Sequence, residues 1–385
     1  MKDHNSIFLL IILSVLFVPF AYIYVIFLIL KELINKNYST IKYLKNNKYL
    51  LLILTSCILS VAFSKYRLIS SFFGMMIFAC ILTFSYVSVN SGGIDIQRIL
   101  TIVYITALIT YIVGAVQMLN PMYIMPEKWV DANEFNLKKR MFSTFFNPNV
   151  FGFYINIIIL ILCVSFDGIK NKRLCAIEKI TFVSSIVCLF FTFSRTSWIS
   201  LVLSLLCIGI LLDKKYIRYA ALIFICIFAA DILLGINRAD ITKLPDDGSF
   251  SYRIELWKTS LKIIKDNLIT GIGFGTFFKY TSVYSGKIVK YIEHCHNIYL
   301  QIFMESGIIG FIAFFTAAVS IFKRTLREYF FNKKDKIGIL VILITVMALI
   351  HGAVDSVSLT PQIMIILSCF AGLVMSKYNV RSKTL

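Results

Sequence analysis

A histidine stands at the boundary between a polar loop and a long apolar run. His296-Asn297 is followed after nine residues by Gly307-Ile308-Ile309-Gly310. Histidine has the side-chain pKa nearest to neutrality, so it can accept a proton at physiological pH. We therefore predict that His296 acts as a base on a lipid-borne substrate at a membrane surface, with Asn297 beside it.

Arginines on the side opposite to the basic loops require an explanation, because topology disfavours positive charge there. Arg140 precedes Asn147-Pro148-Asn149, Arg195 lies in a tight turn, and Arg253 opens a helical pattern. The planar guanidinium suits phosphate oxygens, so we expect these arginines to bind a pyrophosphate, with Lys139 and Asn149 contributing to substrate binding. The alternative for each arginine is contact with lipid headgroups or an ion pair, for instance with Glu255 or Asp231.

A metal centre is not expected. His294 and His296 form an H-x-H pair, but only Cys295 and Glu293 are adjacent, and this spacing cannot place all four around one zinc ion. The chain has nine cysteines, and seven of them lie inside apolar runs without metal-binding spacing. Cysteines in such positions act as small apolar residues. We therefore predict no metal, no cofactor and no disulfide framework.

The composition indicates a membrane protein. Of the 385 residues, 58% are hydrophobic and only 15% are charged, and apolar runs of membrane-spanning length recur along the chain. Backbone polar groups in lipid must be satisfied internally, so these runs are helices. The net charge of +19 sits mostly in short loops, and no nucleic-acid recognition motif accompanies it. We predict an all-α integral membrane protein with about 11–12 transmembrane helices and no nucleic-acid partner.

The apolar runs give the expected helices and their orientation. We predict helices near 7–30, 49–64, 68–89, 97–119, 149–166, 179–194, 197–212, 217–236, 296–322, 337–351 and 357–376. The basic clusters between these runs and in the tail all fall on one side, which the positive-inside rule assigns to the cytoplasm. The odd count puts the N-terminus outside, unless Pro19 splits the first run and gives twelve segments.

The chain reads as a single polytopic domain, 1–385, with two long loops on the outer face, at 120–148 and 237–295. In the second loop Phe250, Ile254, Trp257, Leu261, Ile264 and Leu268 recur at helical spacing, with Lys258, Lys262 and Lys265 on other faces. This pattern predicts an amphipathic helix along the outer membrane surface, either a lid on the helix bundle or a wall of a headgroup site. Three glycines, Gly271, Gly273 and Gly275, then end it in a flexible turn.

The ordered motifs of residues 140–310 resemble those of the O-antigen ligase and polymerase superfamily. The H-N-x9-G-x-x-G stretch from His296 to Gly310 resembles the ligase signature. Three further stretches agree in order: Arg140 with Phe145-Phe146-Asn147-Pro148-Asn149, Phe193-Ser194-Arg195-Thr196, and Arg253 with Trp257 and the glycine turn.

This resemblance implies a metal-independent, inverting glycosyltransferase of the cytoplasmic (inner) membrane whose active face is periplasmic or extracellular. Its donor would be a glycan on undecaprenyl pyrophosphate, and its acceptor a lipid A core in a ligase or a growing glycan in a polymerase. His296 would accept the proton and Arg140, Arg195 and Arg253 would hold the pyrophosphate. From another class, a transporter or flippase of lipid-linked sugar predicts repeated halves and polar residues through the spans.

Overall fold

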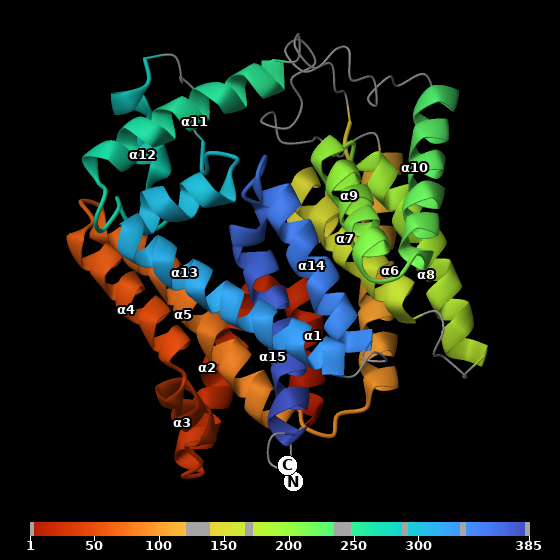
Figure 1. Cartoon of the computed structure of the whole chain (residues 1–385), viewed down its shortest axis with the longest axis horizontal. Helices are drawn as coiled ribbons and strands as arrows, with labels where there is room; N and C mark the ends of the chain where they lie inside the picture. Colours follow the sequence, from red (N-terminus) through yellow and green to blue (C-terminus); the bar gives the residue numbers. More distant parts are fainter. Residues whose placement is uncertain are drawn as a thin grey trace. The chain divides into compact units, whose positions relative to one another are not determined.

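The computed structural model describes residues 4–120, 139–165, 172–234, 248–286, 292–331 and 336–381. These residues are helical with turns between the helices, and no strand occurs among them (Figure 1). Within this described part of the chain, six helices are long and apolar enough to cross a membrane, and a bent pair could add a seventh. The chain is therefore an all-α, multi-pass integral membrane protein. The predicted number of 11–12 crossings stays a prediction.

The six long helices are α5 (Arg67–Asn90), α6 (Ile96–Leu119), α7 (Pro148–Ser165), α8 (Lys172–Phe191), α10 (Lys215–Leu233) and α13 (Ile298–Phe331). The other helices are α1 (His4–Leu16), α2 (Val18–Ile34), α3 (Ser39–Asn46), α4 (Lys48–Phe63), α9 (Arg195–Leu211), α11 (Gly248–Asp266), α12 (Phe277–Tyr284), α14 (Lys336–Gly352) and α15 (Pro361–Arg381). Short 3₁₀ turns lie at Ser143–Phe145 and Val357–Leu359.

The first apolar run is two helices, so the prediction of one helix over 7–30 is wrong. α1 ends at Leu16, and α2 begins at Val18 with Pro19 in its first turn. Proline has no N–H to donate and its ring clashes with the carbonyl four residues earlier, so one continuous helix cannot pass through this point. α2 and α3 then meet at a bend of 106°.

The described helices group into two compact units. The first comprises 1–94, 253–341 and 359–385, and the second comprises 95–252 and 342–358. In the first unit α15 packs along α5, and α13 packs along α4 (Figure 1). The Tyr22 hydroxyl on α2 donates to the Pro361 carbonyl at 2.7 Å, which joins α2 to the start of α15. Whether the units form one functional domain stays a prediction.

The second unit is built around α7. Every residue of α7 except Asn149 is buried, as expected for a helix that is apolar on all sides and surrounded by others. α6, α8 and α9 contact it. The Asn156 amide, in its third turn, donates to the Ser197 carbonyl at 2.8 Å. This central helix fixes Asn149 at its first turn, where the helix meets the chain from Arg140.

The predicted amphipathic helix exists as α11, but its buried face differs from the predicted apolar stripe. Leu256, Ser260 and Ile263 are fully buried, whereas Leu261 is 57% exposed. The Ser260 hydroxyl donates to its own helix at the Leu256 carbonyl, 2.8 Å away. Because that bond satisfies the hydroxyl, serine can lie in the packed face.

Most of the first predicted loop, 121–138 with Lys138, lies outside the described residues. So do 235–247 and 287–291 of the second loop, the ends of the helices predicted at 149–166 and 217–236, and some basic-cluster residues at 170, 333–334 and 383.

Candidate functional site

His296 lies in a short connection between the described end of the second loop and α13, and its backbone is strained. Its φ is +54°, in the left-handed region that side chains larger than glycine rarely occupy. Next to it, the Asn297 Oδ1 atom accepts from the backbone N–H groups of Tyr299 and Leu300, both at 3.0 Å. Asn297 therefore caps α13, and the sharp turn at His296 brings the chain onto that cap. The predicted proton acceptor is thus fixed at a helix N-terminus.

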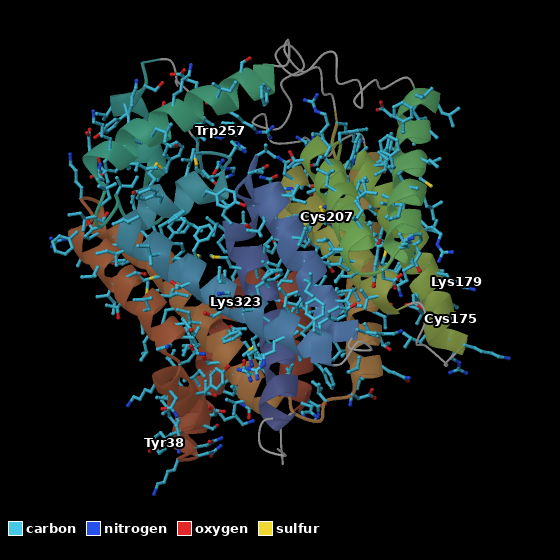
Figure 2. The ribbon with its side chains drawn as sticks, in the orientation of Figure 1. Tyr38, Cys175, Lys179, Cys207, Trp257 and Lys323 are labelled. Atoms are coloured by element: carbon cyan, nitrogen blue, oxygen red, sulfur yellow. The ribbon has the colours of Figure 1, made fainter. Side chains whose placement is uncertain are left out.

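Side chains of its own loop and of α11 contact His296. The Trp257 indole Nε1–H donates to the His296 carbonyl at 3.3 Å (Figure 2 labels Trp257). The His294 and His296 rings lie edge to face, with centroids 4.3 Å apart. His296 is half-buried. Trp257 therefore holds the His296 backbone, His294 contacts the imidazole, and the residue stays partly open.

Two polar residues of α13 anchor this loop. The Gln301 Oε1 atom accepts from the backbone N–H of the buried Cys295 at 2.8 Å, and its Nε2–H donates to Glu305 Oε1 at 2.7 Å. The same Glu305 oxygen accepts from the Gly275 N–H at 2.8 Å. Glu305 is 7% exposed and Gln301 is 3% exposed, so both depend on these bonds. Glu305 therefore joins α13 to the turn at Gly275.

The glycines after α11 form a closely packed connection, so the prediction of a flexible turn is wrong. α13 is kinked at Gly307, whose φ is +64°, and the Gly307 Cα lies against the turn after α11. A Cβ added there would lie 2.1 Å from the Ile269 carbonyl oxygen. Reciprocally, a Cβ on Gly271 (φ +72°) would lie 2.5 Å from the Glu305 carbonyl oxygen. No side chain larger than hydrogen fits at either position, which explains a glycine in each segment.

Backbone hydrogen bonds complete the junction between the glycine connection and α13. Ile272 N–H donates to Met304 O at 2.9 Å, Gly273 N–H to Glu305 O at 3.0 Å, and Ile308 N–H to Leu268 O at 2.8 Å. The kink at Gly307 is therefore hydrogen-bonded to the glycine connection. Arg253, half-buried in the first turns of α11, belongs to the same unit as His296.

In the second unit the structure brings Arg140 and Asn149 together. Arg140 Nε–H donates to the Thr192 carbonyl and its Nη2–H to Asn149 Oδ1, both at 2.8 Å. Asn149 Nδ2–H in turn donates to Asp355 Oδ2 at 2.8 Å. Asp355 is fully buried. The three side chains form a relay that fixes the plane of the guanidinium, which is what bidentate binding of an oxyanion requires.

The other predicted basic residues of this unit have different surroundings. The Lys139 ammonium donates to the carbonyl oxygens of Met118 and Asn120 at the end of α6. It therefore binds carbonyls at a helix C-terminus, where positive charge is also favoured. Arg195 is the first residue of α9 and follows the N-cap Ser194, whose hydroxyl accepts from the Ser197 N–H at 3.4 Å. Its side chain is half-buried.

Most of the strained backbone conformations lie in the segments that carry the candidate residues. Five non-glycine residues among those described have positive φ, namely Lys36, Ser143, Phe146, Phe193 and His296. All but Lys36 lie in the stretches that carry the candidate residues. Such conformations cost about 1–3 kcal/mol each and persist where surrounding contacts impose them. The pattern marks these stretches as candidate functional turns.

The structure thus forms two groups of the predicted residues. Arg253, His296 and Asn297 belong to the first unit, and Lys139, Arg140, Asn149 and Arg195 to the second. Convergence of the two groups on one substrate stays a prediction. Gln301 and Asp355 were not predicted as site residues. Gln301 and Glu305 are two polar residues four apart in an apolar run, a spacing that puts them on one helix face and could have revealed the pair.

Part of this arrangement falls in a region that is similar to a known family. Residues 180–315 match the family model described as O-Antigen ligase. The match includes Arg195, Arg253, His296 and Asn297, whereas Arg140 precedes it. No curated protein matches the chain.

Proposed function

We propose that this O-antigen ligase-like membrane protein, so described by the family match over residues 180–315, is a glycosyltransferase. It moves a glycan from undecaprenyl pyrophosphate to an acceptor hydroxyl at the outer face of the cytoplasmic membrane. The observation that carries the proposal is His296, a half-buried histidine with a strained backbone, next to the residue that caps α13 and inside the matched region.

In the proposed reaction His296 accepts the proton of the acceptor hydroxyl as its oxygen attacks the anomeric carbon of the donor. The new C–O bond forms as the bond from that carbon to the pyrophosphate oxygen breaks, and the pyrophosphate leaves with the bonding electrons. Attack from the opposite side inverts the anomeric centre. A positioned general base contributes about 10²–10⁴-fold to such a step.

The arginine guanidinium groups stabilise the leaving group. Arg140, Arg195 and Arg253 are assigned to the pyrophosphate, whose negative charge grows as the glycosidic bond breaks. The relay from Arg140 through Asn149 to Asp355 supports this role, because a guanidinium fixed before the reaction needs no reorganisation during it. Lys139, whose ammonium lies at the end of α6, is assigned to the same pyrophosphate.

Two residues act on His296 indirectly. Gln301 and Glu305 fix the loop backbone at Cys295 and the glycine connection at Gly275. We assign them as positioning residues because Gln301 binds the backbone of the residue before the histidine and Glu305 holds Gln301 in place. The acceptor decides between the two family activities: a lipid A core gives a ligase, and a growing lipid-linked glycan gives a polymerase.

The test is a transfer assay with the full-length protein in liposomes. The donor is an undecaprenyl pyrophosphate glycan, and the acceptors are lipid A core in one arm and a second donor molecule in the other. The proposal predicts release of undecaprenyl pyrophosphate and a new glycosidic bond of inverted configuration, measured by mass spectrometry and NMR. Movement of intact donor between leaflets without a new bond would instead identify a transporter.

A further inference from the structure

α11 carries a second apolar surface besides its packed face. Phe250 and Leu261 on the helix are 39% and 57% exposed, and Leu268 and Ile269 in the following turn are 51% and 64% exposed. These four residues, here called the exposed stripe, leave α11 with apolar groups on two sides. Packing against the rest of the protein explains the apolar groups on only one of these two sides.

A row of lysines borders the exposed stripe. Lys258, Lys262 and Lys265 each follow an apolar residue by one position and are all exposed. At about 100° per residue, Lys258, Lys262 and Lys265 lie roughly 60°, 100° and 40° round the helix from Leu261, so the lysines lie beside the stripe rather than opposite it. Lysine at this place can extend its ammonium towards phosphate while its alkyl chain stays in apolar surroundings.

The acidic residues of α11 are directed to α12 and the residue after it. Glu255 Oε1 accepts from the Ser285 hydroxyl at 3.3 Å, and Asp266 Oδ2 accepts from the Tyr284 hydroxyl at 2.9 Å. Both carboxylates are thereby held on the α12 side of the helix. The side that carries the stripe is bordered by positive charge (Figure 1 shows α11 and α12 together).

We propose that the exposed stripe docks on the anionic lipid surface of the bilayer that contains the other helices. Phe250, Leu261, Leu268 and Ile269 enter the boundary between headgroups and acyl chains, and the lysine row binds the lipid phosphates. An apolar stripe next to a row of one charge is the arrangement that binds anionic membrane surfaces. Through Trp257 and the glycine connection, this contact also fixes the height of the His296 loop above the membrane.

The experiment measures membrane immersion directly and without any substrate. Cys175, Cys207 and Cys226, the native cysteines that are not buried, are replaced by alanine in the full chain. A nitroxide is attached at Leu261→Cys, or at the adjacent control Lys262→Cys, in phosphatidylglycerol-containing liposomes. Electron paramagnetic resonance then compares collisions with oxygen, which concentrates in lipid, and with a water-soluble nickel complex.

The proposal predicts that the label at position 261 prefers oxygen and the label at 262 prefers nickel. The preference at 261 reverses in liposomes of phosphatidylcholine alone and in a Lys258→Gln/Lys262→Gln/Lys265→Gln background. A nickel preference at 261 in anionic liposomes overturns the proposal. Protection of the label at 261 from both reagents also overturns the proposal, because protein then covers the stripe. An oxygen preference at 261 that is unchanged in the lysine-free background overturns it as well. Circular dichroism of each labelled protein verifies the helical fold.

Discussion

The Trp257 indole donates a hydrogen bond to the carbonyl oxygen of His296 at 3.3 Å, which joins α11 to the loop before α13. The two residues are far apart in sequence, and one belongs to a surface helix while the other is the proposed base. This bond makes the conformation of the His296 backbone depend on the position of α11.

Replacing Trp257 with phenylalanine removes this bond and keeps an aromatic ring. We expect kcat for glycan transfer to fall by up to about tenfold, because one such bond contributes about 0.5–1.5 kcal/mol. KM for the donor should change little. Trp198 is the matched control, since its Nε1–H also donates to a backbone carbonyl, that of Leu189, at 2.9 Å. Equal kcat values in Trp257→Phe and wild type would remove the link between α11 and the base.

Replacing Gln301 with alanine leaves the buried Cys295 N–H without its acceptor and removes a donor from Glu305. An unsatisfied buried group costs about 1–3 kcal/mol, so we expect a lower melting temperature together with a lower kcat. The buried Gln362, whose amide donates to the Val15 carbonyl at 3.4 Å, serves as the control for stability alone. A Gln301→Ala protein that melts lower yet transfers at the wild-type rate would show a purely structural role.

Replacing Gly307 with alanine should destabilise the protein much more than the same change at Gly93. Both glycines have positive φ, but a Cβ at Gly93 meets nothing within 4 Å, whereas one at Gly307 meets the Ile269 carbonyl. Gly93→Ala therefore costs only the conformational term, about 1–2 kcal/mol. Melting temperatures of the purified variants measure the difference. Similar values for the two would contradict the close packing of the glycine connection against α13.

The Cys295 thiol should be unreactive at neutral pH. Burial raises its pKa to about 12, and only the thiolate is nucleophilic. The native fold favours the neutral thiol, so its contribution to stability is complete below the ordinary value of 9.0 and is lost as the pH rises towards 12. Alkylation of Cys295 followed by mass spectrometry should be slow at pH 7.5, while an introduced Ser251→Cys on the exposed part of α11 reacts. Fast labelling of Cys295 would contradict its burial.

The sequence was sufficient for the all-helical membrane class and for most helix positions, because apolar runs in lipid leave the backbone no other structure. It failed where a local backbone feature overrides the apolar pattern. Pro19 separates α1 from α2 inside one continuous apolar run, and Gly307 kinks α13 inside another. Pro19 was named as a possible break in its run, whereas the kink at Gly307 was not predicted, because a glycine leaves the apolar character of the run unchanged.

For the candidate site, the sequence identified the residue types but not their partners. Arg140 and Asn149 were both selected, yet their mutual bond and the link to Asp355 depend on how α7 lies against the turn before α15. The apolar pattern did not show that α11 also packs through Ser260, which satisfies its hydroxyl within the helix. These are tertiary facts, and periodicity contains no information about them.

The most direct test of the central claim compares two histidines two residues apart. His296→Gln keeps hydrogen-bonding capacity but cannot act as a base, and His294→Gln makes the same change on the neighbouring ring, 4.3 Å away. Glycan transfer is measured with the lipid-linked donor in liposomes, after circular dichroism has shown both variants to be folded. The account predicts a loss of about 10²–10⁴-fold for His296→Gln and a much smaller change for His294→Gln. Wild-type transfer by His296→Gln would contradict it.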